Sequence, residues 1–292
     1  MPSNQEQQCN LTSVDVELYP QASGAAASLA ATHSEPQPLK LYAGWFCPFV
    51  QRAWLALEEK KIPYQYIEIN PYQKAKSFLE LNPRGLVPTL ACPTGPDGKE
   101  TKPLYESNVI CEYLDESYGD ASKHGPSLLP ADPYQRARCR IWIDFISSRI
   151  VPAFYRFCQH QPHSSYSIQD ARSEFLDHLK TFIKEADPDG PFFLGPTFSM
   201  VDIALAPWLI RLWVFDHFKT GGLGMPEAGE EGGQEHETWP RWRKWAAAVK
   251  ERRSVQETTS ARERYIPAYQ RYAEDTTQSQ VAQATRSGRK LP

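Results

Sequence analysis

The sequence has no long apolar run and no excess of charge of one sign. None of its apolar stretches approaches the roughly 20 residues that a membrane-spanning helix needs, so we expect no membrane segment. The 292 residues include 32 Lys and Arg against 35 Asp and Glu, which gives a formal net charge of −3. This balance offers no electrostatic reason to expect nucleic acid or an anionic membrane surface as a partner.

The N-terminal region lacks the pattern of a targeting signal. It has no basic stretch followed by an apolar core, so we expect no secretory signal. Residues 1–37 are rich in Gln, Ala and Ser and contain no Arg, which argues against a mitochondrial presequence. The sequence therefore predicts a cytoplasmic protein.

The cysteines lack any paired spacing. There are six, Cys9, Cys47, Cys92, Cys111, Cys139 and Cys158, and none forms a C-x-x-C pair or a Cys/His metal pattern. An even number could indicate disulfides, but a chain of this length does not need them for stability. We therefore expect a reducing compartment and no metal site.

The first ordered part of the chain alternates between strand and helix patterns. Residues 1–38 show no sustained period and predict a flexible N-terminal arm. The order β-α-β-α-β-β-α follows within residues 39–119, which implies a βαβ crossover and a mixed sheet covered on both faces. The predicted strands are 39–43, 64–69, 87–92 and 102–106, and the predicted helices are 48–61, 75–81 and 107–118.

The second part reads as helical throughout. A linker rich in Gly, Ser and Pro covers residues 120–131, and Asp132-Pro133 has the pattern of a helix start. Within residues 132–272 we predict one long helix over 134–157 with a kink at Pro152, and three more over 168–187, 197–215 and 239–255. The polar segment 273–292 predicts a disordered tail. The chain thus predicts two domains, α/β and then all-α.

The stretch "GWFCPFVQRAW" places Cys47 where a strand ends and a helix begins. A helix N-terminus carries free N–H groups and the positive end of the dipole, so a thiolate is favoured there. The pKa of Cys47 is then expected to fall from about 8.5 towards neutrality, which suits nucleophilic or redox chemistry. A packed, inert cysteine between Phe46 and Phe49 is the alternative. Val50 stands where a thioredoxin-type dithiol would have its second cysteine, so a redox Cys47 acts alone.

Two further stretches have the composition of a peptide-binding site. In "NPRGLVPTL", a cis Pro88 would turn the backbone of Val87 outward to pair with an extended peptide thiol, unless the stretch is a plain turn. In "YESNVICEYL", Ser107 is expected to cap a helix whose first N–H groups bind a carboxylate, with Glu106 beside it for an ammonium. These two groups suit the zwitterionic head of an amino acid, although Ser107 could be a plain N-cap.

These stretches, together with "LLPADPYQRA", resemble the cytosolic glutathione transferases of the omega class over roughly residues 39–272. The resemblance implies a thioredoxin-like N-terminal domain, an all-α C-terminal domain, glutathione as cosubstrate and a homodimer. Members of this class use a cysteine that becomes linked to glutathione. They catalyse thiol-disulfide exchange and reduce dehydroascorbate.

The resemblance also implies roles for individual residues. Cys47 matches the catalytic cysteine. Trp245 matches a tryptophan that faces the cleft for the second substrate, unless it only packs between helices. The expected glutathione contacts are Phe49, Lys74, Val87, Pro88, Glu106 and Ser107, with Lys76 as the alternative to Lys74. Ser199 and Asp202 resemble the family's helix cap, which we interpret as a folding element. Tyr42 as a thiol-activating hydroxyl is an alternative to Cys47, but its strand position favours a core tyrosine.

Two other functions remain open from the sequence. One is a transferase or ether-cleaving enzyme dedicated to a single metabolite, which the loop over 221–237 would suit. The other is a regulator that keeps the fold without the chemistry. The chain also departs from the family at Arg84, where an apolar residue would be ordinary.

Overall fold

A computed structural model describes residues 19–70, 73–95, 97–229 and 237–292. Its single four-stranded sheet has the order β2-β1-β3-β4, with β1 parallel to β2 and antiparallel to β3, and β3 antiparallel to β4. The strands are β1 Lys40–Ala43, β2 Gln65–Glu68, β3 Thr89–Thr94 and β4 Glu100–Leu104. The mixed sheet predicted from the sequence is confirmed.

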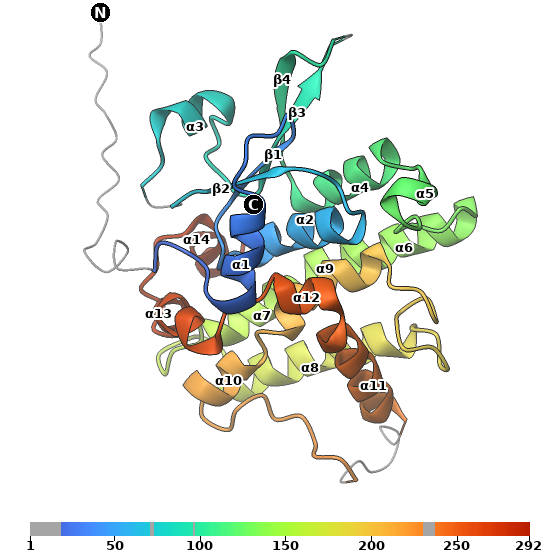
Figure 1. The fold of residues 1–292 in the computed structure, drawn as a ribbon. Helices are drawn as coiled ribbons and strands as arrows, with labels where there is room; N and C mark the ends of the chain where they lie inside the picture. Colours follow the sequence, from blue (N-terminus) through green and yellow to red (C-terminus); the bar gives the residue numbers. More distant parts are fainter. Residues whose placement is uncertain (1–18, 71–72, 96, 230–236) are drawn as a thin grey trace, which may run out of the picture.

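Helices α2 (Pro48–Glu59) and α4 (Ser107–Ser117) lie between the sheet and the helical part of the molecule (Figure 1). α2 is buried on nearly all sides, from Val50 through Leu57, because it packs against both α4 and the helical part. The remaining helix of this part, α3 (Lys76–Leu81), lies apart from this pair. The start of α2 is therefore held from both halves of the chain.

The helical part begins at Pro133, as predicted, with Asp132 as its N-cap. Its elements are α6 Pro133–Phe145, η2 Ile146–Ile150, α7 Val151–Cys158, α8 Ile168–Lys184, α9 Met200–Leu209, α10 Trp213–Phe218, α11 Thr238–Glu251, α12 Arg253–Glu257 and α13 Arg262–Ala273. A short helix, α5 (Ala121–His124), lies in the predicted linker. Two of the predicted helices are each divided in two, at residues 210–212 and at Arg252.

The predicted kink at Pro152 takes the form of a π-helical turn, η2, just before it. Proline has no N–H to donate to the carbonyl four residues back, so an α-helix cannot continue through it without adjustment. A π turn absorbs that mismatch within an otherwise continuous helix, and such turns are frequent at functional sites. Ser147 and Ser148 of this turn line the cavity described below.

The predictions for the two ends of the chain are partly wrong. Residues 1–18 of the expected flexible arm lie outside the described residues, but α1 (Gly24–Thr32) is a helix with Ala26 buried. The expected disordered tail contains α14 (Gln280–Arg286), in which Ala282 and Ala284 are buried. Short helices gain most of their stability from packing, which local sequence patterns do not reveal.

A buried capping box organises the core of the helical part. The backbone N–H and the hydroxyl of Ser199 donate to the Asp202 carboxylate at 2.8 and 2.7 Å, as predicted. Asp202 also accepts from the N–H of Phe193, and burial raises the pKa of its carboxyl. Among the described helices, none is both long and apolar enough to cross a membrane.

Candidate active site

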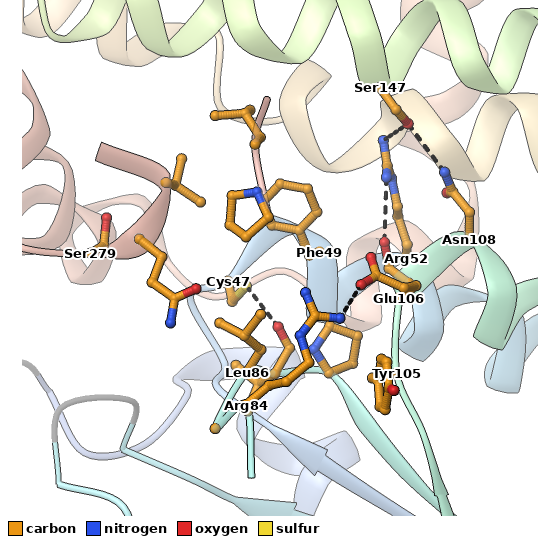
Figure 2. A pocket seen from close by; sticks show the side chains of 18 of the residues that line it. Cys47, Phe49, Arg52, Arg84, Leu86, Tyr105, Glu106, Asn108, Ser147 and Ser279 are labelled. Atoms are coloured by element: carbon orange, nitrogen blue, oxygen red, sulfur yellow. Dashed lines mark hydrogen bonds and ion pairs between the residues drawn. The ribbon is translucent and has the colours of Figure 1, made fainter. Parts of the chain in front are cut away.

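The turn after β1 positions Cys47 at the start of α2. The Cys47 N–H donates to the carbonyl of Gly44 at 2.9 Å, and its carbonyl accepts from the N–H of Gln51 inside the helix. The sulfur lies 3.9 Å from the carbonyl oxygen of Val87, which precedes a cis peptide bond to Pro88 (Figure 2). The sequence predictions of a thiol at this seam and of a cis Pro88 are both confirmed.

The predicted direction of the Cys47 pKa is wrong. The N–H groups of Phe49 and Val50 do favour the thiolate, as the helix argument requires. Burial of the sulfur outweighs them, so the pKa of Cys47 lies above its ordinary value. Cys47 is nevertheless partly exposed, whereas the other described cysteines are buried.

Two buried arginines, which the sequence analysis missed, flank the thiol. Arg52 and Arg211 are 2% and 1% exposed, and both lower the pKa of Cys47. Arg52 donates to the Ala204 carbonyl at 2.9 Å, and Arg211 donates to the carbonyl of Phe46 at 3.2 Å. No carboxylate of a described residue pairs with either guanidinium. The sequence does contain a sign of Arg52, because a charged residue stands on the apolar face of the predicted helix.

Arg52 also connects the two halves of the site. Its guanidinium donates to the hydroxyls of Ser107, at the start of α4, and Ser147, in the π turn, each at 3.4 Å (Figure 2). Ser147 also accepts from the Asn108 amide at 3.1 Å. Burial lowers the pKa of Arg52 to about 10, which leaves it charged at neutral pH.

Glu106 and Ser107 lie at the start of α4, but not in the predicted arrangement. Ser107 is the first helical residue and not the cap, and its hydroxyl is bonded to Arg52. Glu106 takes the cap position with φ +70°, a conformation that side-chain-bearing residues rarely adopt and that clusters at functional sites. Its carboxylate accepts from Arg84 at 2.5 Å, so the unusual Arg84 neutralises Glu106 in this structure.

Lys74 reaches the same cavity across Gly85. Gly85 has φ +62°, and a Cβ there would lie 3.1 Å from the Lys74 ammonium nitrogen and 3.0 Å from Leu79. A side chain at position 85 would therefore displace Lys74. Glycine explains how the "NPRG" turn and the Lys74 side chain pack so closely.

One cavity of about 1100 Å³ brings most of the predicted residues together. Its lining includes Cys47, Phe49, Lys74, Val87, Pro88, Glu106 and Ser107. Phe49 packs edge-on against Trp208, with ring centroids 5.1 Å apart. The lining also includes residues from 278 to 292, which the sequence analysis assigned to a disordered tail.

Trp245 does not belong to this cavity, so its predicted role is wrong. It is fully buried, its indole N–H donates to Asp202 at 2.7 Å, and its ring packs against Phe182 and Trp242. Tyr42 is also absent from the lining and stacks on Phe78. In the described residues, no group of three or more His, Cys, Asp or Glu side chains is arranged to hold a metal ion.

Comparison with known proteins identifies the family. The model for the glutathione S-transferase N-terminal domain matches residues 46–117, and the C-terminal domain model matches residues 165–248. Glutathione S-transferase omega-1 of Sus scrofa is 35% identical over 196 residues, which is 65% of this chain and 75% of the relative. The chain belongs to the glutathione S-transferase family.

A solved structure supports the omega class. Glutathione transferase Omega 3C from Trametes versicolor is 39% identical, with a TM-score of 0.73 over 89% of this chain and 100% of that one. Omega-1 of Rattus norvegicus is 33% identical over 65% of this chain and 76% of the relative. This omega-class glutathione transferase therefore has the thioredoxin-like and all-helical parts that the sequence predicted, and glutathione is its cosubstrate.

Proposed function

We propose that this transferase is a thioltransferase that works through Cys47. The Cys47 thiolate attacks the glutathione sulfur of a mixed disulfide, forms a Cys47–glutathione disulfide and releases the other thiolate, which takes a proton from water. A second glutathione thiolate then attacks the bound glutathionyl sulfur, which yields glutathione disulfide and restores Cys47. Dehydroascorbate enters the same cycle after glutathione adds to its carbonyl. The Cys47 thiolate attacks the sulfur of this adduct, the carbon–sulfur bond breaks with its electron pair and a proton from water gives ascorbate, and a second glutathione then resolves the Cys47–glutathione disulfide.

The observation that carries this proposal is a partly exposed thiol, Cys47, in one cavity with Lys74, Val87 and Glu106. Val87, beside Cys47, offers backbone groups for the cysteinyl part of glutathione. Lys74 suits its glycine carboxylate, and Glu106 suits the ammonium of its γ-glutamyl head. Without a second cysteine at position 50, glutathione is the natural resolving thiol.

The decisive variant is Cys47→Ser. We expect it to abolish turnover of 2-hydroxyethyl disulfide and of dehydroascorbate, because a serine hydroxyl forms no mixed disulfide. Incubation with glutathione disulfide should add one glutathionyl group to the wild-type protein by intact mass, and none to the variant. The buried Cys139→Ala serves as the control and should keep wild-type activity. A Cys47→Ser protein with an unchanged rate would rule out the mechanism.

Glutathione binding is expected to depend on Glu106. Glu106→Ala should weaken glutathione by about ten- to a hundredfold, because a charge-assisted contact of about 1.5–3 kcal/mol is lost. Arg84→Ala should leave the affinity within about fivefold of wild type, since its exposed pair with Glu106 is worth at most about 1 kcal/mol. Calorimetry measures both, and equal affinities in wild type and Glu106→Ala would show that the γ-glutamyl site lies elsewhere.

We further propose a cytoplasmic homodimer, as the family resemblance implies. Light scattering of the purified protein tests the assembly, and a monomer mass would remove that part of the proposal. The activity does not depend on the outcome, because every residue assigned above lies in one chain.

A further inference from the structure

The segment after α13 is fixed against the helical part of the molecule. Gln159 donates to the carbonyl of Ala282 at 3.3 Å and to Asp275 at 2.8 Å. The guanidinium of Arg286 donates to the same Asp275 carboxylate at 2.9 Å. The chain from residue 275 to α14 is thus held by a polar cluster as well as by the buried alanines.

This segment forms one wall of the active-site cavity. Val281, Leu291 and Pro292 give it an apolar surface, and the cavity also contacts Phe46 and Phe49 beside Cys47. Figure 2 shows Ser279 on one side of Cys47 and Glu106 on the other. The glutathione side of the cavity and the wall formed by residues 278–292 therefore flank the reactive sulfur from different directions.

The wall also carries a cation. Of the charged residues that line the cavity, Arg84 and Glu106 neutralise each other, and Asp144 accepts from the Ser148 hydroxyl at 3.4 Å. The buried Arg52 donates to Ala204 and Ser107, and Lys74 packs against Gly85 on the glutathione side. No hydrogen bond or ion pair joins the Lys290 ammonium to any residue in the part of the chain that the structure describes. An ammonium beside an apolar surface attracts a ligand that combines an apolar body with an anionic end.

We propose that residues 278–292 form the second-substrate subsite and select an apolar, anionic group attached to the sulfur that reacts with Cys47. Leu291 contacts the apolar body and Lys290 its anionic end. This inference rests on the proposed glutathione site, but it does not require the exchange chemistry.

Glutathione thioethers test the subsite without any reaction, because their C–S bonds are not exchanged. The ligands are S-methylglutathione, S-benzylglutathione and S-(4-carboxybenzyl)glutathione, measured by calorimetry. For the wild-type protein we expect S-benzylglutathione to bind about tenfold more tightly than S-methylglutathione, through burial of the ring. The carboxybenzyl compound should bind more tightly again, by up to about fivefold, through an ion pair with Lys290.

Two variants separate the two contacts. Leu291→Ser should reduce the benzyl preference to about twofold or less, and Lys290→Gln should remove the carboxyl preference alone. Lys250→Gln, an exposed lysine outside the cavity, is the matched control and should keep both preferences. Thermal unfolding checks that each variant is folded.

Each result decides one part of the inference. An unchanged benzyl preference in Leu291→Ser would overturn the apolar wall, and an unchanged carboxyl preference in Lys290→Gln would overturn the anionic end. S-methylglutathione should bind all four proteins equally. If it fails to bind the wild type, the glutathione site itself is misplaced, which is a separate failure from that of the subsite.

Discussion

At the residue scale, the state of Cys47 is decided by two opposed effects. The start of α2 and the cations of Arg52 and Arg211 favour the thiolate, whereas burial favours the thiol. Burial prevails, so the pKa of Cys47 is raised. The helix N-terminus was visible in the sequence, but Arg211, which acts on the same thiol, lies 164 positions further along the chain.

This balance predicts the order in which the cysteines react. With iodoacetamide across a pH series and peptide mapping, Cys47 should alkylate before Cys111 and Cys158, whose pKa values burial raises to about 12. Its rate should rise through the alkaline range, because only the thiolate reacts. Full alkylation of Cys47 at pH 6 would contradict the raised pKa.

Removing a flanking cation should raise the pKa of Cys47 further. We expect Arg211→Met to move the midpoint of Cys47 alkylation to higher pH, since a positive charge that favours the thiolate is lost. Arg253→Met removes a cation from the exposed surface of α12 and should not move the midpoint. Identical midpoints in all three proteins would show that Arg211 does not act on the thiol.

At the scale of elements, the end of β2 holds the turn that carries Cys47. The Glu68 carboxylate accepts from the Trp45 N–H and from the Tyr66 hydroxyl, each at 2.9 Å. Burial raises the pKa of Glu68 from an ordinary 4.5 to about 7. The alternation over residues 64–69 predicted this strand, but nothing in the sequence indicates that its last residue supports the catalytic turn.

The raised pKa of Glu68 makes stability depend on pH. Between pH 4.5 and about 7 the unfolded chain loses this proton while the folded protein keeps it, so the free energy of unfolding falls as pH rises through that window. Glu68→Gln does not titrate and should lack this decline. Urea denaturation should therefore show that the free energy of unfolding of the variant, relative to that of wild type, is higher at pH 8 than at pH 5. Glu80→Gln, on the exposed surface of α3, should have the wild-type free energy of unfolding at both pH values.

The sequence predicted those elements whose patterns are local. The strands, α2 and the Ser199–Asp202 cap have periodic apolar residues or fixed capping residues, and each was found within a few positions of its prediction. The Trp245 role failed because burial is set by the packing of α8, α9 and α11 together. The helix α14 was missed for the same reason, because its place beside Cys47 depends on contacts with α7.

At the scale of the molecule, the N-terminal segment joins the two parts of the fold. The His33 carbonyl accepts from the Tyr66 N–H at 2.8 Å and so covers the edge strand β2. On the other side, just before α13, the Ser23 N–H donates to the Ser260 hydroxyl at 3.1 Å. The Ser23 hydroxyl accepts from the Ala261 N–H at 3.0 Å. The segment from Ser23 to His33 thus connects the sheet to α12 and to the turn before α13.

This connection predicts a selective loss of stability when α1 is undocked. Ala26 is 1% exposed, so Ala26→Asp buries an unpaired carboxylate unless α1 separates from α12. We expect faster amide exchange over residues 24–32 and a loss of about 2 kcal/mol in the free energy of unfolding. Ala25→Asp places the same charge on the exposed side of the helix and should change neither quantity. Glutathione affinity should stay at the wild-type value in both variants, because α1 does not line the cavity. If both variants have the same free energy of unfolding, α1 does not join the two parts. If Ala26→Asp alone also loses glutathione affinity, the segment acts on the Cys47 turn. The link would then be the hydrogen bond from the Trp45 indole to the Tyr19 carbonyl.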